Sequence, residues 1–340
     1  MWYNGFIIWK KSTEKAMKTK KLLSIFAATL LSATALFGCT ASDTKIEFKN
    51  NWLKDPLLSQ TSLTETLCYD VTFEKSAGSN TLKYAFGYEN GSYTTTLTKR
   101  STEEFDYTTK LTIDVVYSWN GETITLQDTV ETSVHFISAN DGLTPIKSTK
   151  TILSHSPVNA TEEVSALNKC YNTSHYSIET TYADGKGTAK IQENPDIAEG
   201  EKDYKAPKTL TFNMGKKLSY LDNEQLLLGL RAFDSSTTSG TVQSYAPFEG
   251  GMQKISLSFN SKKQSKELNV AVTENSQAKE IKLFEYRTAT IALKATNSGA
   301  DKTAWVATEN RNVILRLEHP LPFNFGTLVY SLKSIDRTES

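Results

Sequence analysis

Two long runs of alternating residues, joined by a two-residue turn, constrain this chain more than any other feature. Apolar side chains occupy every second position from Leu111 to Trp119, and the same phase resumes from Ile124 to Phe136. A period of two is typical of strands with one buried face, and Asn120-Gly121 between the runs suits a tight hairpin. The runs exceed the usual strand length of about 5–6 residues. We therefore expect a sheet that curves to bury one face.

Similar patterns recur along the chain. Alternation over Asn80–Tyr88 and Tyr93–Leu97, on either side of Asn90-Gly91, predicts a second hairpin. Asp141-Gly142 and Asp184-Gly185 predict further turns. Short strand patterns follow at 255–259, 268–272, 281–283, 291–293, 304–306, 313–317 and 328–332. The predicted fold class is all-β, with a strongly curved antiparallel sheet or half-barrel.

One segment, about 222–233, predicts a short amphipathic helix instead. Asp222 can serve as the N-cap, and Gln225 completes a capping-box pattern. Leu226, Leu230 and Phe233 lie on one apolar stripe that also includes Leu227. A glycine inside this stripe, Gly229, weakens the helix by about 1 kcal/mol relative to alanine. We therefore expect the helix to depend on packing against the sheet.

The body from residue 61 to residue 340 shows no repeat and no change of composition, which favours a single β domain. The loop-like stretch Asn194–Pro207 is an alternative boundary.

The N-terminal region has the features of a secretory signal peptide. Lysines follow Met17, an apolar run extends from Leu22 to Phe37, and a cysteine follows at Cys39. This run is shorter than the roughly 20 apolar residues of a transmembrane helix. We interpret residues 1–38 as a signal peptide. Within them, Met17 is the expected initiator, and residues 1–16 come from an upstream start site chosen in the gene prediction.

The end of this region, Leu36-Phe37-Gly38-Cys39, resembles the lipobox of bacterial lipoproteins. The resemblance implies that a signal peptidase recognises Leu36 and Gly38, and that Cys39 becomes the acylated N-terminus. Residues 39–60 would then form a lipidated tether, docked through Trp52, Leu53 and Leu57. The protein would be exported and held outside the cytoplasm on a bacterial membrane. An ordinary signal peptide or membrane anchor is the alternative.

Charge excludes one class of partner. Residues 1–38 carry six lysines and one acid, so the part from Cys39 onward has 32 basic and 37 acidic residues. A surface with an excess of acidic residues repels the negatively charged phosphates of nucleic acids, so we expect no nucleic acid partner.

Cys68 and Cys170 lie in a chain expected to be exported, where a disulfide is permitted. A bridge between them and two free thiols are both compatible with the sequence.

Three segments together resemble an uncharacterised family of exported bacterial β domains of unknown function. They are Asp222-Asn-Glu-Gln-Leu-Leu, Leu315–Phe323 (LRLEHPLPF) and Gly326–Ile335 (GTLVYSLKSI). The resemblance implies a fold similar to the half-barrels of lipoprotein carriers. It implies no activity, because a fold can carry many functions.

Sequence motifs for catalysis are missing. The chain has no Gly-x-Ser-x-Gly elbow, no His-Glu-x-x-His and no glycine-rich phosphate loop before a helix. The four histidines, at 135, 155, 175 and 319, are scattered. An enzyme would need at least two of them to converge with carboxylates. We expect no enzyme activity, no cofactor and no metal site.

Aromatic residues on the long hairpins are the candidate binding residues: Tyr84, Phe86, Tyr88, Tyr117 and Trp119. They either fill the core or line a cleft for an amphiphile such as an acyl chain. The leading hypothesis is a lipid-anchored envelope protein that binds an apolar or amphiphilic ligand on the concave face of its sheet. The alternative is a structural or protein-interaction component of the envelope without a small-molecule ligand.

Overall fold

The computed structural model describes residues 45–46, 48, 52–54, 62–77, 81–139, 142–158, 164–215, 217–232, 238–246, 251–293 and 301–339. The signal peptide, the lipobox residues Leu36 and Gly38, Cys39, and Leu57 lie outside these residues. Within the part that is described, no helix is both long enough and apolar enough to cross a bilayer.

Strands dominate the structure. In order, the strands are β1 Leu63–Lys75, β2 Ala85–Lys99, β3 Glu104–Trp119, β4 Glu122–Ile137, β5 Thr144–Pro157, β6 Tyr171–Ala183, β7 Lys186–Glu193, β8 Lys208–Asn213, β9 Ser219–Tyr220, β10 Ser239–Ala246, β11 Gly251–Phe259, β12 Gln264–Glu274, β13 Gln277–Leu293, β14 Lys302–Ala307, β15 Ile314–Pro320 and β16 Gly326–Glu339. The helical elements are α3 Leu226–Arg231 and the 3-10 turns η1 Trp52–Lys54, η3 Leu167–Lys169, η4 Asn223–Gln225, η6 Asn310–Asn312 and η7 Pro322–Asn324.

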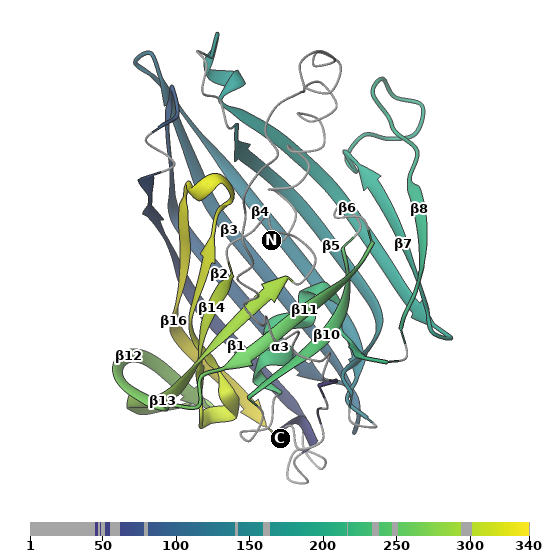
Figure 1. The fold of residues 1–340 in the computed structure, drawn as a ribbon, viewed down its shortest axis with the longest axis vertical. Helices are drawn as coiled ribbons and strands as arrows, with labels where there is room; N and C mark the ends of the chain where they lie inside the picture. Colours follow the sequence, from purple (N-terminus) through teal and green to yellow (C-terminus); the bar gives the residue numbers. More distant parts are fainter. Residues whose placement is uncertain are drawn as a thin grey trace, which may run out of the picture.

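These strands form one strongly curved, mainly antiparallel sheet (Figure 1). Its order is β8-β7-β6-β5-β4-β3-β2-β1-β16-β15-β14-β13-β11-β10-β9. Strand β12 pairs with both β13 and β16, so β12 to β16 close into a ring of five strands. The prediction of an all-β, curved antiparallel sheet with one short helix is confirmed.

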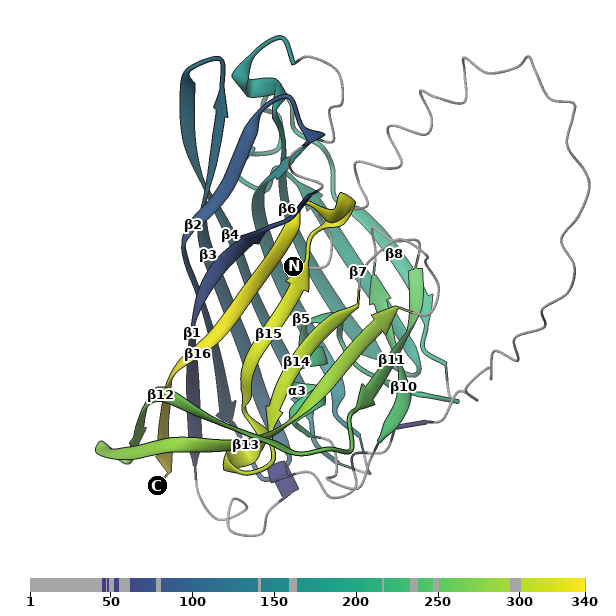
Figure 2. The same cartoon turned by 60° about the vertical axis from the view of Figure 1, so that its left-hand side comes forward.

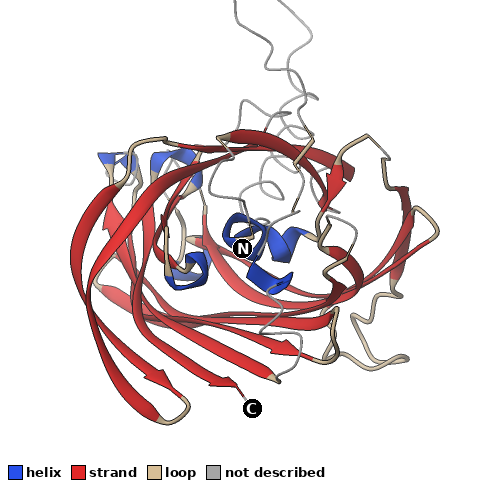
Figure 3. Cartoon of the chain, turned by 90° about the horizontal axis from the view of Figure 1, so that it is seen from below, coloured by secondary structure: helices blue, strands red, loops and turns tan. Residues whose placement is uncertain are grey.

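The predicted short helix is also confirmed: the 3-10 turn η4 continues into α3, which ends at Arg231, and α3 lies inside the curve of the sheet (Figure 3). Phe233, the last residue of the predicted apolar stripe, lies outside the described residues. Asp222 caps the 3-10 turn η4 that leads directly into α3, its side chain accepting a hydrogen bond from the backbone N–H of Glu224 at 2.8 Å, and Gln225 completes the capping box. The glycine has a packing role, because a Cβ on Gly229 would lie 2.7 Å from Leu221 Cδ1. Glycine at position 229 therefore lowers the helix propensity but allows α3 to pack closely against Leu221.

The predicted hairpin at Asn90-Gly91 is wrong. Strand β2 runs straight through these residues, and its register with β3 shifts between Glu89 and Ser92. A Cβ on Gly91 would lie 2.5 Å from the carbonyl oxygen of Val71, so only glycine fits beside β1 at this point. The Asn-Gly pair forms a β-bulge here, an irregularity that also favours positive φ. Asn90 has a φ of 50°.

The other turn predictions fare better. Asn120-Gly121 joins β3 to β4, and Asp184-Gly185 joins β6 to β7. Asp141 lies outside the described residues, although β4 and β5 on either side of it pair in antiparallel fashion. The patterns at 281–283 and 291–293 belong to one long strand, β13, rather than to two.

Candidate functional site

Four of the five candidate aromatic residues pack on one another, and Trp119 packs against the same cluster. Phe86 lies 6.1 Å from Tyr88 and 6.3 Å from Tyr117, measured between ring centroids, and Tyr84 lies 6.1 Å from Tyr117. Tyr84, Phe86 and Tyr117 are buried, whereas Tyr88 and Trp119 are half-buried. Tyr84, Phe86 and Tyr117 belong to a second hydrophobic cluster; Tyr88 and Trp119 pack against it, and Tyr88 also packs against the main core. The structure thus places these residues in a core.

A buried carboxylate and imidazole adjoin this cluster. Asp128 Oδ1 lies 2.9 Å from Nδ1 of His155, and it accepts a hydrogen bond from the backbone N–H of the same residue at 2.7 Å. The hydroxyl of Tyr117 donates to the carbonyl oxygen of His155 at 2.6 Å. Burial raises the pKa of Asp128 despite these hydrogen bonds. This pair anchors β5 to β4 where the two strands stop pairing.

The remaining histidines are separate from this pair. His135 is part-exposed, with Nδ1 3.0 Å from Asp106, and Nε2 of His175 lies 3.8 Å from Asp196. Burial and nearby Lys302 hold the pKa of His319 well below its usual value. Within the described residues, no group of three or more His, Cys, Asp or Glu is arranged to hold a metal ion.

The two cysteines do not meet either. Cys68 lies on β1, where Thr94 Oγ1 lies 4.0 Å from its sulfur, and Cys170 is buried after η3. Both are free thiols in the structure, so the bridge considered from the sequence is not formed.

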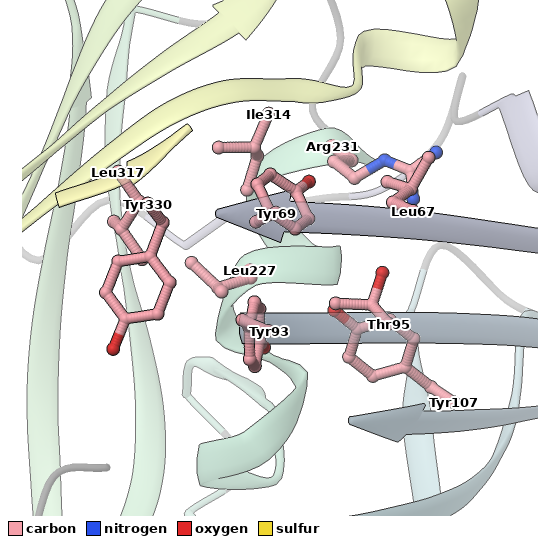
Figure 4. A pocket seen from close by; sticks show the side chains of 10 residues that line it. All are labelled: Leu67, Tyr69, Tyr93, Thr95, Tyr107, Leu227, Arg231, Ile314, Leu317 and Tyr330. Atoms are coloured by element: carbon pink, nitrogen blue, oxygen red, sulfur yellow. The ribbon is translucent and has the colours of Figure 1, made fainter. Parts of the chain in front are cut away.

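A small cavity instead lies between the concave face of the sheet and helix α3 (Figure 4). Its volume admits about one water molecule. Four tyrosines line it, together with Thr95, Arg231 and four aliphatic residues. The tyrosines are Tyr69, Tyr93, Tyr107 and Tyr330, and the aliphatic residues are Leu67, Leu227, Ile314 and Leu317. The strands supply eight of these side chains, and α3 supplies Leu227 and Arg231.

The phenols around this cavity stay protonated at neutral pH. Burial raises the pKa of Tyr107 to about 12, and it also raises the pKa values of Tyr69, Tyr93 and Tyr330. Protonated phenols can donate hydrogen bonds as well as accept them. The cavity therefore combines apolar walls with polar groups, as small-molecule sites generally do.

A buried ion-pair network fixes Arg231 at the edge of the cavity. Arg231 donates to Oε1 of Glu65 at 2.6 Å, and Arg337 donates to Oε2 at 2.8 Å. Burial alone would raise the pKa of Glu65, but the two guanidinium groups overcome this effect and lower it. Arg337 also contacts Glu274 of β12 at 3.2 Å. The network therefore joins α3 to β1, β16 and the strand that closes the ring.

The other end of the helical segment is held by a second set of polar contacts. Glu224 pairs with Lys150 of β5 at 2.6 Å, and the hydroxyl of Tyr182 on β6 donates to Asp222. Burial opposes ionisation of Glu224, but Lys150 lowers its pKa to about 2. Burial and the nearby Glu224 raise the pKa of Asp222. Charged and polar groups thus attach α3 to the sheet at both ends.

No local sequence motif identifies the partners of Arg231 or the four tyrosines as site residues. A signal was present, because Glu65 occupies the same strand phase as buried Leu63 and Leu67. Likewise, Arg337 follows buried Ile335 by two positions on β16. A charged residue at an inward-facing position is a sequence mark of a buried ion pair.

Comparison with known proteins adds no further assignment: no protein-family model, no curated protein and no solved structure matches this chain. The family resemblance and the lipobox therefore remain predictions from the sequence.

Proposed function

We propose that this chain is a lipid-anchored protein of the cell envelope that binds an apolar or amphiphilic ligand on the concave side of its sheet. Attachment occurs through Cys39 after export, as the lipobox-like sequence implies. The observation that carries the binding proposal is the cavity between the sheet and α3, in which Tyr69, Tyr93, Tyr107 and Tyr330 meet aliphatic side chains.

The size of this cavity requires α3 to act as a displaceable plug. Space for about one water molecule cannot hold an acyl chain. The apolar contacts of α3 come from Leu226, Leu228 and Leu230, which are fully buried, and from Leu227, which lines the cavity. An acyl chain that replaced these side chains would exchange one apolar contact for another. The polar contacts of Glu224 and Arg231 then determine how readily the plug leaves.

Fluorescence of N-phenyl-1-naphthylamine, a neutral apolar probe, tests this proposal. Glu224→Gln removes the charge that pairs with Lys150, so we expect more probe uptake. Leu227→Phe enlarges the apolar contact between α3 and the cavity walls and should hold the plug in place, so we expect less. Glu179→Gln is the matched control, because it breaks the exposed Lys147–Glu179 pair on neighbouring strands. Far-UV circular dichroism checks that each variant is folded. Equal uptake by all four proteins would refute the proposal.

A structural or protein-interaction role without a small-molecule ligand is the second candidate. The observation that favours it is the filling of the interior by α3 and by Ile46, Phe48 and Leu53. Crosslinking in cells separates the two proposals. A stable protein partner, with no amphiphile extracted from the purified complex, supports the second.

A further inference from the structure

The segment that leads to the proposed anchor is packed into the body instead of hanging free. Ile46, Phe48 and Leu53 are 2%, 0% and 3% exposed. Lys45 forms a parallel β-bridge with Thr241 at the start of β10. The hydroxyl of Ser219 donates to the carbonyl oxygen of Ile46. The described part of residues 45–54 therefore belongs to the folded body.

Trp52 fastens this segment at one end of the half-barrel. Two guanidinium groups lie over its ring, with the Cζ atoms of Arg231 and Arg311 4.9 Å and 5.6 Å from the ring centroid. Cation–π contacts of this kind contribute about 0.5–2 kcal/mol each. Arg231 in turn binds Glu65, which lies near the start of β1 opposite Leu97, close to the end of β2. Figure 2 shows the described part of residues 45–54 as short purple segments in the lower part of the molecule.

The geometry points to an orientation on the membrane. Only six residue steps separate Cys39 from Lys45, and whatever their conformation they span at most roughly 20 Å. Strand β3 has 16 residues, so its two ends lie about 50 Å apart. We propose that a lipid bilayer faces the end of the half-barrel that carries Trp52 and the β2–β3 turn. This inference depends on the acylation of Cys39 in the proposed function.

One consequence concerns the second aromatic cluster. It includes Phe86 near the start of β2, Tyr117 near the end of β3, and Phe325 beside the β15–β16 turn. These positions lie at the opposite end of the long strands from Glu65 and Trp52. In this orientation the cluster points away from the bilayer.

Energy transfer to the membrane measures the orientation directly. The full mature chain, acylated at Cys39, is reconstituted in phosphatidylcholine vesicles that contain a rhodamine-labelled lipid. Cys68 and Cys170 are replaced by alanine, and one donor is attached through Thr102→Cys or Glu122→Cys. These exposed sites flank the two ends of β3. We expect several-fold more transfer from residue 102 than from residue 122.

A linker insertion supplies the matched control. Twenty Gly/Ser residues between Thr44 and Lys45 add a flexible span of about 25 Å, so the difference between residues 102 and 122 should shrink. The same insertion between Asn120 and Gly121 should leave transfer from residue 102 unchanged. Equal transfer from both sites in the parent chain, or more from residue 122, overturns the orientation. A chain that does not associate with vesicles overturns the anchor itself, and the two failures are therefore distinguishable.

Discussion

Removing the buried charge of Glu65 should cost more stability than removing any surface charge of this chain. Its carboxylate is fully buried and accepts hydrogen bonds from Arg231 at 2.6 Å and from Arg337 at 2.8 Å. Breaking a buried ion pair from one side costs about 3–5 kcal/mol, because the remaining charges lose their partner. Glutamine keeps a hydrogen-bonding oxygen, so we expect about 3 kcal/mol for Glu65→Gln.

Urea denaturation of a soluble form that begins at Thr40 measures this loss. Glu179→Gln is the control, since the exposed pair with Lys147 contributes only about 0–1 kcal/mol. The combined replacement of Glu65 by Leu, and of Arg231 and Arg337 by Met, should recover much of the loss. Hydrophobic substitutes for a buried ion network often restore stability.

The pH dependence of this effect has a definite sign. The two arginines lower the pKa of Glu65 in the folded state. Its contribution is therefore complete above the unfolded pKa, near 4.3, and is lost as the pH falls through the folded pKa. The free-energy gap between the parent chain and Glu65→Gln should be constant at neutral pH and shrink in acid. A gap below about 1 kcal/mol at pH 7, where a broken buried pair should cost several times more, would refute the reasoning. So would a gap that persists in strong acid.

Three further predictions concern packing, thiols and pH. Gly229→Ala should destabilise the chain by about 1–3 kcal/mol despite its better helix propensity, because the new Cβ meets Leu221; urea unfolding measures this, and a gain in stability would contradict it. Cys68 and Cys170 should both react with iodoacetamide after unfolding without reductant, and mass analysis showing neither alkylated would contradict the free thiols. The lowered pKa of His319 means that the unfolded chain binds its proton first, so unfolding free energy should fall as the pH drops below about 6.5. Unfolding midpoints of His319→Gln should change less over that range, and equal changes in both proteins would refute this prediction.

Much of the fold follows from local sequence signals. The alternation over β3 and β4 and the turn at Asn120-Gly121 agree with the structure because neighbouring strands reinforce the local preference. The same dipeptide at Asn90-Gly91 gave a wrong hairpin prediction. Strand β2 pairs with β1 on one side and β3 on the other, so the chain continues as one strand with a β-bulge at this point. Tertiary pairing overrides a turn preference there.

The candidate site was harder to predict, for a physical reason. Glu65, Arg231 and Arg337 are far apart in the sequence, so no local motif records their meeting. Alternation placed Tyr84 and Tyr117 on the inward face of the sheet. Inward-facing aromatic residues are expected both in a packed core and in a ligand-binding cleft, so the sequence pattern does not separate the two. In the structure both side chains are buried in a hydrophobic cluster. The capping box at Asp222 was predictable because all its partners lie within four residues.

The concave side of the sheet should receive an amphiphile at the position that α3 occupies. Native mass spectrometry of the detergent-free soluble chain, purified from the cells that make it, tests this claim most directly. We predict a species heavier than the protein by one small amphiphile, with less of it in Leu227→Phe than in the parent chain. A single species at the mass of the bare protein, before and after incubation with a fatty acid, would contradict the claim.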